Sequence, residues 1–473
     1  MDRRKFFRNG SLAAIGSTIL NPFQGAAQNL DFDTLRKNKK AKNIIFLVSD
    51  GMSSGTLNMA DLYVNRKLGR SSNWIQLYKD NLVSRALMDT SSANSIVTDS
   101  AAGSSAWGSG FKVNNGSICV GVNGEEYLPI WQKFKQVGKM AGCVTSVPIT
   151  HATPSGFCVN SKSRNGQEEI AEKYLDINFD VMMGGGFEYF DASKRKDKRD
   201  LFNDFEKKGY QVVKSRDEML AANSLKPILG VFGTDEEALP FELDRQNDES
   251  LKKSMPTLAE MTQKAIDKMK DNPKGFVLQV EGGKVDWAAH SNDIGGLLYD
   301  QVAFDDAIKI AIDFAAKDKE TLVIITTDHG NGNPGIIYGK KADTNFDSLQ
   351  NYKYSNERIL NSIHSDTSIA QIREIIEFGN GKAISEVDAK ILMGYYTGLK
   401  VEEGLYNYKK LPYQELADMQ TKNTSVGWIS MEHTADHVEL AMFGPGSEML
   451  KPFMKNTDLH YLMLKAAEVE NKF

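Results

Sequence analysis

The sequence predicts an α/β protein with a doubly wound, mostly parallel sheet flanked by helices, and two observations support this fold class. The first is a set of short apolar runs that end abruptly in polar residues, as buried parallel strands do where they deliver functional side chains. These runs lie at 43–50, 141–154, 275–283 and 321–331. The second is that helical patterns, with apolar residues three and four apart, lie between the runs, at 258–272 and 297–318. A sheet of this kind places its binding sites at the carboxyl ends of the strands.

A looser segment interrupts this alternation late in the chain. From about Gly335 to Gly427 the sequence is polar and rich in Tyr and Asn, and the apolar run at 438–447 then predicts another strand. We interpret 335–427 as a cap or crown inserted into a single catalytic domain, 28–473. The last candidate metal ligand comes just after this insertion.

Length and charge restrict the class of function. A chain of 473 residues can bury a large core, which is typical of a sizeable enzyme. Its 57 Lys and Arg residues against 62 Asp and Glu residues give a formal net charge of -5. Because nucleic-acid binding requires a basic surface, we expect no nucleic-acid-binding role.

The N-terminal residues are typical of an export signal. Arg3 and Arg4 precede a short, weakly apolar stretch and then Gly25–Ala27, small residues at which a signal peptidase could cut. We interpret residues 1–27 as a twin-arginine signal peptide; the alternative is a basic cytosolic tail. The mature protein is then expected in the periplasm or outside the cell. No apolar run elsewhere reaches the length of a membrane span, so we expect no transmembrane segment.

The chain has three cysteines, Cys119, Cys143 and Cys158, whose spacing matches no zinc ribbon or CxxC motif. We expect three buried thiols. A bridge between Cys143 and Cys158 is the alternative.

Candidate metal ligands gather where the predicted strands end. Glu281, Asp286 and His290 occur in "VEGGKVDWAAH", and the last two stand four residues apart, so a helix would place them on one face. Such a pair alone is more often a solvated helix face. Asp328 and His329 directly follow another apolar run, however, and project from a fixed backbone.

Two further residues extend this set. Asp50 ends the first run in "FLVSDGM", where the alternative role is to cap the next helix. His433 lies just before the strand that follows the insertion. Histidine and carboxylate ligands without cysteine suit zinc, whereas carboxylate and hydroxyl oxygens suit magnesium, and both kinds are present.

The stretch "VTDSAAGSSAW" at 97–107 closely resembles the nucleophile signature of the alkaline phosphatase family. Five other motifs follow the order of that family: "NIIFLVSDGM", "THATP", "LQVEGGKVDWAAH", "TTDHG" and "EHT". The similarity spans about Lys42 to Gly446 and is weak over the insertion. Six motifs in one order make the resemblance specific.

The resemblance implies a metal-dependent hydrolase of phosphate monoesters with two Zn²⁺ ions, one Mg²⁺ ion and a serine nucleophile. Ser100 is similar to that nucleophile. The residues similar to the ligands of one zinc are Asp286, His290 and His433; of the second zinc, Asp50, Ser100, Asp328 and His329; and of magnesium, Asp50, Thr153 and Glu281. Members of the family are commonly dimers, so we expect a homodimer.

Arg164 lies thirteen residues after His151, the spacing at which the family keeps the arginine that grips the phosphoryl oxygens. Lys162 is the alternative, because "CVNSKSR" departs from the usual "HVNSR". A planar guanidinium suits two oxygens better than a point charge, which favours Arg164. His151 and Trp287 stand where other members carry Asp and Lys, and we expect both to adjust the magnesium site and phosphate contacts.

The implied reaction is attack of Ser100 on phosphorus, followed by hydrolysis of the phosphoserine by water. Broad specificity follows, because the contacts concentrate on the phosphoryl group rather than on the leaving group. The alternatives are a phosphodiesterase, a phosphonate hydrolase, a sulfatase, or an exported scaffold without catalysis. A sulfatase needs a CxPSR-like motif, which the chain lacks, and a diesterase often carries Thr as nucleophile. The complete set of ligands, serine and arginine argues against an inactive scaffold.

Overall fold

The computed structural model describes residues 40–223, 225–233, 238–397 and 411–471. The predicted signal peptide lies outside the described residues. No helix within the described ranges is long and apolar enough to cross a membrane.

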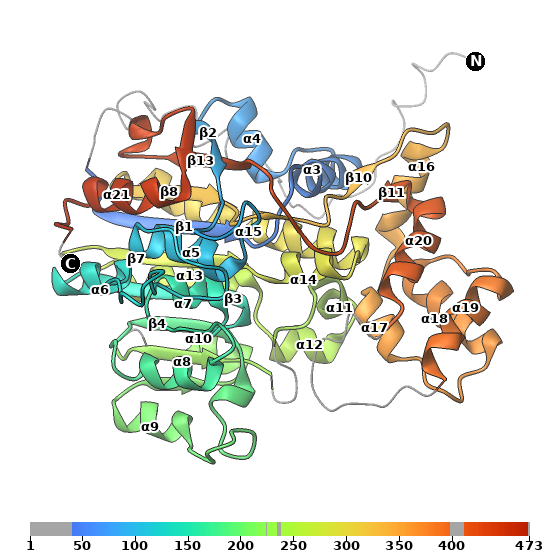
Figure 1. The fold of residues 1–473 in the computed structure, drawn as a ribbon, viewed down its shortest axis with the longest axis horizontal. Coiled ribbons are helices and arrows are strands. Elements are labelled where there is room, and N and C mark those ends of the chain that lie inside the picture. Colours follow the sequence, from blue (N-terminus) through green and yellow to red (C-terminus); the bar gives the residue numbers. More distant parts are fainter. Residues whose placement is uncertain (1–39, 224, 234–237, 398–410, 472–473) are drawn as a thin grey trace, which may run out of the picture.

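A ten-stranded sheet forms the centre of the molecule (Figure 1). From one edge to the other its strands are β14 (Phe453–Lys455), β2 (Ser84–Asp89), β13 (Val438–Phe443), β8 (Thr321–Thr326), β1 (Asn43–Ser49), β7 (Phe276–Gly282), β3 (Met140–Pro148), β4 (Val181–Gly185), β6 (Ile228–Val231) and β5 (Gln211–Val213). Only β13 runs antiparallel to its two neighbours in this sheet. The predicted mostly parallel sheet flanked by helices is therefore confirmed.

Alternation along β1 shows how the two faces of the sheet are covered. Ile45 and Leu47 pack into one apolar cluster, whereas Ile44, Phe46 and Val48 pack into the other, because successive side chains of a strand point to opposite faces. The first face carries α3 (Ser54–Leu68), α4 (Asn73–Lys79), α10 (Arg216–Ala221), α11 (Glu242–Gln246), α13 (Leu258–Met269), α14 (Lys284–His290) and α15 (Ile294–Asp318). The second carries α5 (Ser100–Ser109), α6 (Ile130–Gln136), α7 (Ala152–Gly156), α8 (Gln167–Tyr174), α9 (Leu201–Lys207) and α21 (Asn456–Ala466).

The starts of several helices are fixed by side-chain caps. Ser53 accepts the Thr56 amide at the start of α3, so the alternative role of Asp50 as a cap is excluded. Asp293 accepts the Gly296 amide at the start of α15. Such caps satisfy amides that lack a partner within the helix and determine where it begins.

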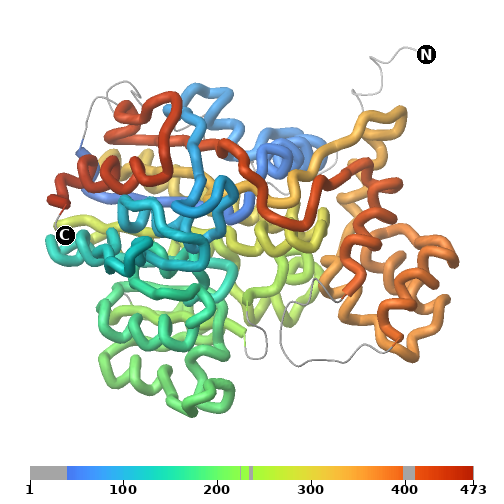
Figure 2. Tube along the Cα trace, in the orientation of Figure 1, coloured from blue at the N-terminus to red at the C-terminus, as the bar shows by residue number. Residues whose placement is uncertain are grey.

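A helical segment lies beside the sheet, seen at the right of Figures 1 and 2. It leaves the sheet domain at β10 (Gly335–Ile336) and returns at β11 (Val426–Gly427), and these strands pair antiparallel. Between them lie α16 (Ala342–Asp347), η2 (Ser348–Asn351), α17 (Asn356–Asn361), α18 (Ile369–Asn380), α19 (Glu386–Tyr396) and α20 (Tyr413–Thr424). The segment has an apolar cluster of its own, centred on Ile359, Ile372 and Leu392. Its function as a cap stays a prediction.

Two predicted strands extend too far. The run at 141–154 ends as a strand at Pro148, and its last residues form α7. The run at 321–331 divides, because β8 ends at Thr326 and a separate β9 (Gly330–Asn331) pairs with β12 (His433–Thr434). Both departures occur where the chain turns across the carboxyl edge of the sheet. The elements not yet mentioned are η1 (Phe187–Tyr189), α12 (Glu249–Ser254) and η3 (Ser447–Met449).

Candidate active site

The carboxyl edge of the sheet brings three predicted acids together. Asp50 directly follows β1, Glu281 lies near the end of β7, and Asp328 comes two residues after β8. These strands are neighbours in register, with Val48 of β1 opposite both Glu281 and Thr326. All three carboxylates are fully buried, so water does not screen their mutual repulsion.

Helix α14 supplies the predicted pair four residues apart. Nε2 of His290 lies 3.4 Å from Oδ2 of Asp286, as expected for neighbours on one helix face. His433 arrives from β12, and its Nε2 lies 3.7 Å from Oδ1 of Asp286. Asp286, His290 and His433 therefore form one group whose ligand atoms all lie within 4.8 Å of one another.

His290, His329 and His433 all place Nε2 toward the acids. Nδ1 of His290 lies 2.8 Å from the carbonyl oxygen of Met431, and Nδ1 of His433 lies 2.9 Å from that of Thr98. Nδ1 of His329 lies 3.3 Å from the carbonyl oxygen of the next residue. Because a carbonyl only accepts, each Nδ1 carries the hydrogen and each Nε2 keeps a lone pair for a metal ion.

A second group surrounds the predicted nucleophile. Nε2 of His329 lies 3.5 Å from Oδ1 of Asp50 and 3.4 Å from Oδ2 of Asp328. Oγ of Ser100 lies 3.2 Å from the same nitrogen and 3.5 Å from Oδ1 of Asp50. The serine hydroxyl thus lies within 3.5 Å of both an imidazole nitrogen and a carboxylate oxygen.

A third group combines Asp50, Glu281 and His151. Thr153 Oγ1 lies 3.4 Å from Oδ2 of Asp50, beside this group. Thr145 donates to one oxygen of Glu281, while the other oxygen has no hydrogen-bond partner among the described residues. A buried oxygen left without a partner is costly, and a cation would relieve that cost.

The charges of the site favour bound cations. Burial, together with the carboxylates of Asp328, Asp286 and Glu281, raises the pKa of Asp50 well above its ordinary value. Burial likewise raises the pKa of Asp328 and of Glu281, and it lowers the pKa of His329 and of His433. Carboxylate oxygens and neutral imidazoles crowded in this way fit divalent metal ions held by mixed nitrogen and oxygen ligands.

Small residues let α5, the helix of the predicted nucleophile Ser100, approach these groups. Ser100 is the first residue of α5, and Asp99 caps the helix by accepting the Ala102 amide at 3.0 Å. A Cβ added at Gly103 would lie 3.2 Å from Cβ of Asp328, and one added at Gly156 of α7 would lie 2.7 Å from Cβ of Ser104. Larger residues would therefore push α5 away from the acids.

Arg164 lies beside the loop that precedes Ser100. Its Nη1 donates to Oδ2 of Asp99 at 3.0 Å, and its Nη2 lies 3.0 Å from Nε2 of His151. Because a guanidinium always donates, His151 accepts at Nε2 and carries its hydrogen on Nδ1. In this arrangement Nδ1 of His151 has no lone pair for a metal ion. Lys162 is exposed, and its side chain has no hydrogen bond or ion pair with the described residues.

Trp287 and three residues that the sequence did not single out, Lys284, Asn331 and Thr145, contact one another or the candidate ligands. The Trp287 ring is 6.3 Å from that of His151, and the Lys284 ammonium lies 4.8 Å from its centroid. Asn331 donates Nδ2 to Oδ1 of Asp286 at 2.7 Å. The sequence does carry one signal for Asn331 and Thr145: each is a polar residue in or beside a predicted buried strand, where apolar residues are usual.

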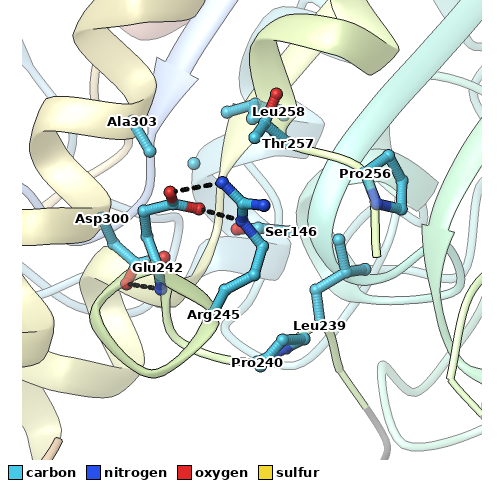
Figure 3. A pocket seen from close by; sticks show the side chains of 11 residues that line it. Ser146, Leu239, Pro240, Glu242, Arg245, Pro256, Thr257, Leu258, Asp300 and Ala303 are labelled. Atoms are coloured by element: carbon cyan, nitrogen blue, oxygen red, sulfur yellow. Dashed lines mark hydrogen bonds and ion pairs between the residues drawn. The ribbon is translucent and has the colours of Figure 1, made fainter. Parts of the chain in front are cut away.

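A pocket between Ser146, Arg245 and Asp300 is largely filled by side chains (Figure 3). Arg245 makes two hydrogen bonds with Glu242, each 2.8 Å long, and the Glu242 amide donates to Asp300 at 3.0 Å. The remaining volume of about 20 Å³ holds no more than one water molecule. This pocket therefore provides no space for a substrate.

The three cysteines and the other three histidines belong to none of these groups. The three cysteines are buried free thiols, as expected. His364 and His437 are exposed, and His460 is buried with its Nδ1 3.0 Å from the carbonyl oxygen of Trp107.

A mostly parallel sheet with buried acids, imidazole nitrogens and a serine at its carboxyl edge is typical of α/β hydrolases that use metal ions. The family model described as alkaline phosphatase matches residues 41–469. The chain therefore belongs to the alkaline phosphatase family, whose members hydrolyse phosphate monoesters.

Relatives and solved structures agree along nearly the whole chain. Alkaline phosphatase 4 of Bacillus subtilis (strain 168) is 31% identical over 472 residues, covering 96% of this chain and 95% of the relative. The crystal structure of Thermus thermophilus alkaline phosphatase matches with a TM-score of 0.84 and 30% identity, covering 97% of this chain and 96% of that one. A cold-active alkaline phosphatase from Shewanella sp. matches with a TM-score of 0.75 and 27% identity, covering 90% of this chain and 99% of that one.

Proposed function

We propose that this protein is an exported alkaline phosphatase that hydrolyses phosphate monoesters with broad specificity through a phosphoserine at Ser100. The observation that carries this proposal is the position of the Ser100 hydroxyl. Its Oγ lies 3.2 Å from Nε2 of His329 and 3.5 Å from a carboxylate oxygen of Asp50, at the first residue of a helix. No other hydroxyl of "VTDSAAGSSAW" has both kinds of neighbour.

The three groups of ligand atoms would hold two Zn²⁺ ions and one Mg²⁺ ion. We assign Asp286, His290 and His433 to one zinc, Asp50, Ser100, Asp328 and His329 to the other, and Asp50, Thr153 and Glu281 to magnesium. When bound, the metal ions would lower the pKa of bound hydroxyl groups and offset the negative charge of the phosphoryl group. The hydrogen on Nδ1 of His151 supports a donor role for this residue beside the magnesium group rather than direct ligation.

Ser100 carries the covalent chemistry in this proposal. Its Oγ forms a bond to phosphorus while the bond from phosphorus to the ester oxygen breaks, and the alcohol leaves with the proton that the serine hydroxyl loses. A water oxygen then forms a bond to phosphorus and the bond from phosphorus to Oγ breaks. Inorganic phosphate is released, and a proton of the water restores the serine hydroxyl. The helix N-terminus at Ser100 directs free amides toward the anionic phosphoryl group.

Arg164 would hold two oxygens of the phosphoryl group. Asp99 holds one side of the guanidinium at 3.0 Å, which fixes the plane of the guanidinium before substrate arrives. Because these contacts go to the phosphoryl group, the alcohol of the substrate contributes little to recognition. Broad monoester specificity follows from that distribution of contacts.

Three further features are part of this proposal. Residues 1–27 would direct export by the twin-arginine route to the periplasm or the outside of the cell. The segment 335–427 would cap the site, since it ends only six residues before His433, which lies beside the acids. The mature protein would form a homodimer.

Turnover of p-nitrophenyl phosphate tests the proposal. The wild type should be active, and Ser100→Ala should lose activity by about three orders of magnitude or more. Ser109→Ala is a matched control, because this serine lies at the far end of the same helix, where its hydroxyl donates to the Ser105 carbonyl and accepts the Phe111 amide. Mass spectrometry of acid-quenched protein should find phosphate on Ser100. Full activity of Ser100→Ala would exclude the covalent route.

Metal analysis and a diester substrate test the remaining parts. The purified protein should contain two zinc ions and one magnesium ion per chain, and chelation should abolish its activity. A higher kcat/KM for bis-p-nitrophenyl phosphate than for p-nitrophenyl phosphate would make the protein a diesterase instead.

A further inference from the structure

A short turn at 114–117 lies between the loop that carries the nucleophile and the loop that carries Arg164. The Ser117 amide donates to the Asn114 carbonyl at 3.1 Å, which closes the turn. Gly116 has φ +86°, a left-handed conformation that glycine adopts without strain. The turn lies between the reactive groups in space, although neither motif includes it.

The side chain of Asn115 makes two hydrogen bonds to the backbone of residues 97–99, the loop before Ser100. Its Oδ1 accepts the Asp99 amide at 3.2 Å, and its Nδ2 donates to the Val97 carbonyl at 3.0 Å. The Asn115 amide in turn donates to Oδ1 of Asn94 at 3.0 Å. One carboxamide thus fixes the backbone on both sides of Thr98, directly before Ser100.

Gly116 connects the same turn to the arginine loop. Its amide donates to Oδ2 of Asp99 at 2.9 Å, and its carbonyl accepts the Arg164 amide at 2.8 Å. Two residues further on, Ile118 and Ser161 exchange a pair of backbone hydrogen bonds, each 2.9 Å long. Residues 116–118 therefore run antiparallel beside 161–164 and hold the backbone of Arg164.

These contacts converge on Asp99. Its carboxylate accepts from the amides of Ala102 and Gly116 and from Nη1 of Arg164. A carboxylate with three donors in fixed directions determines the plane of the guanidinium that it holds. The separation of Ser100 from the Arg164 guanidinium thus depends on where the turn places Asp99.

We propose that Asn115 is a positioning residue that sets the geometry in which Ser100 and Arg164 bind a phosphoryl group. This inference rests on the proposed function of those two residues. Asn115 is exposed, and its side-chain bonds go to Val97 and Asp99 rather than to the core. Loss of its carboxamide should therefore loosen phosphate binding without unfolding the protein.

The test measures the inhibition constant of inorganic phosphate, kcat and KM for p-nitrophenyl phosphate, and the thermal midpoint. Asn115→Ala should weaken phosphate binding and lower kcat/KM by about tenfold, with an unchanged thermal midpoint. Asn123→Ala is the matched control, because Asn123 is an exposed asparagine whose side chain donates to Glu125 within its own turn at 2.9 Å. The control should bind phosphate as the wild type does.

A double-mutant cycle with Arg164→Ala shows whether Asn115 acts through the arginine. In that background Asn115→Ala should have little further effect on phosphate binding. A full tenfold effect in that background, or an unchanged inhibition constant in the single variant, would overturn the inference. If Asn115→Ala does not fold, Asn94→Ala loosens the same turn from the other side, and an unchanged inhibition constant there overturns it.

The same measurements keep the two proposals apart. If the wild type does not hydrolyse p-nitrophenyl phosphate, the proposed function fails. If the wild type is active and Arg164→Ala binds phosphate weakly while both asparagine variants behave as wild type, only the role of Asn115 fails.

Discussion

Nε2 of His290 lies 3.1 Å from Nε2 of His433, and both rings place Nδ1 within 2.9 Å of a backbone carbonyl. Two nitrogen lone pairs at this separation repel each other unless a cation lies between them. The carboxylate of Asp286, beside both rings, favours that cation as well. The positions of these two rings therefore favour a bound metal ion and make the metal-free protein less stable.

Chelated protein should be less stable than protein with zinc, because bound metal removes the repulsion between these groups. Zinc at 100 to 1,000 times its dissociation constant should stabilise the fold by about 3–4 kcal/mol. The check is the thermal midpoint of chelated wild type during a zinc titration. In His433→Ala the zinc response should shrink, whereas His437→Ala, at an exposed histidine, should keep it. Equal midpoints with and without zinc in the wild type would contradict this prediction.

Gly156→Ala should destabilise the protein and lower kcat, because its Cβ would lie 2.7 Å from Cβ of Ser104 on α5, the helix that Ser100 begins. We expect a loss of about 1–3 kcal/mol in the free energy of unfolding, measured by denaturant titration. Gly394→Ala is the control, since this helical glycine has nothing within 4 Å of an added Cβ. That variant should be stabilised by about 0.5–1 kcal/mol. A stable, fully active Gly156→Ala would mean that α5 has room to move.

Much of the fold could be predicted because the buried strands have strong local signals. β1 and β8 have continuous apolar cores, and β7 is interrupted only by Gln279 and Glu281, as is typical of strands covered on both faces. β5 and β14 have only three residues each, and β6 has four, which is too short for an apolar pattern to stand out. These strands form because their neighbours already offer a sheet edge.

The candidate site divides in the same way. The four-residue spacing of Asp286 and His290 and the strand-end position of Asp50 are properties of the local sequence. The contacts of His433 with Thr98 and of Asn115 with Asp99 join residues far apart or in separate loops, and neither leaves a periodic signal. Which of Arg164 and Lys162 lies beside the loop of Ser100 also depends on the backbone hydrogen bond from the Arg164 amide to the Gly116 carbonyl, which no motif encodes.

Arg164→Lys should weaken the binding of inorganic phosphate by about 10- to 100-fold, because a lysine makes one point contact where the guanidinium fork makes two. Lys162→Ala should change the inhibition constant by less than about twofold, since the side chain is exposed and without partners among the described residues. Competitive inhibition of p-nitrophenyl phosphate turnover measures both. A larger effect at Lys162 than at Arg164 would reverse the assignment.

Asp300→Asn should stabilise the protein at alkaline pH. Burial, followed by the carboxylates of Glu242 and Asp244, raises the pKa of Asp300 well above its ordinary value, although Lys284 lowers it in part. The folded state therefore binds a proton that the unfolded state has released, so stability falls as the pH rises from about 4 toward the raised pKa. This loss amounts to up to about 1.4 kcal/mol per pH unit.

The variant should not show this loss, because asparagine does not titrate. Its side-chain oxygen can still accept the Glu242 amide, which donates to Asp300 at 3.0 Å in the wild type. Urea titrations of wild type and Asp300→Asn at pH 5 and pH 8 should show an advantage of the variant that grows with pH. Asp313→Asn, a partly exposed position on the same helix, should differ from wild type by less than about 0.5 kcal/mol at either pH. An advantage of Asp300→Asn that is the same at both pH values would mean that Asp300 is ionised in the folded protein throughout this range.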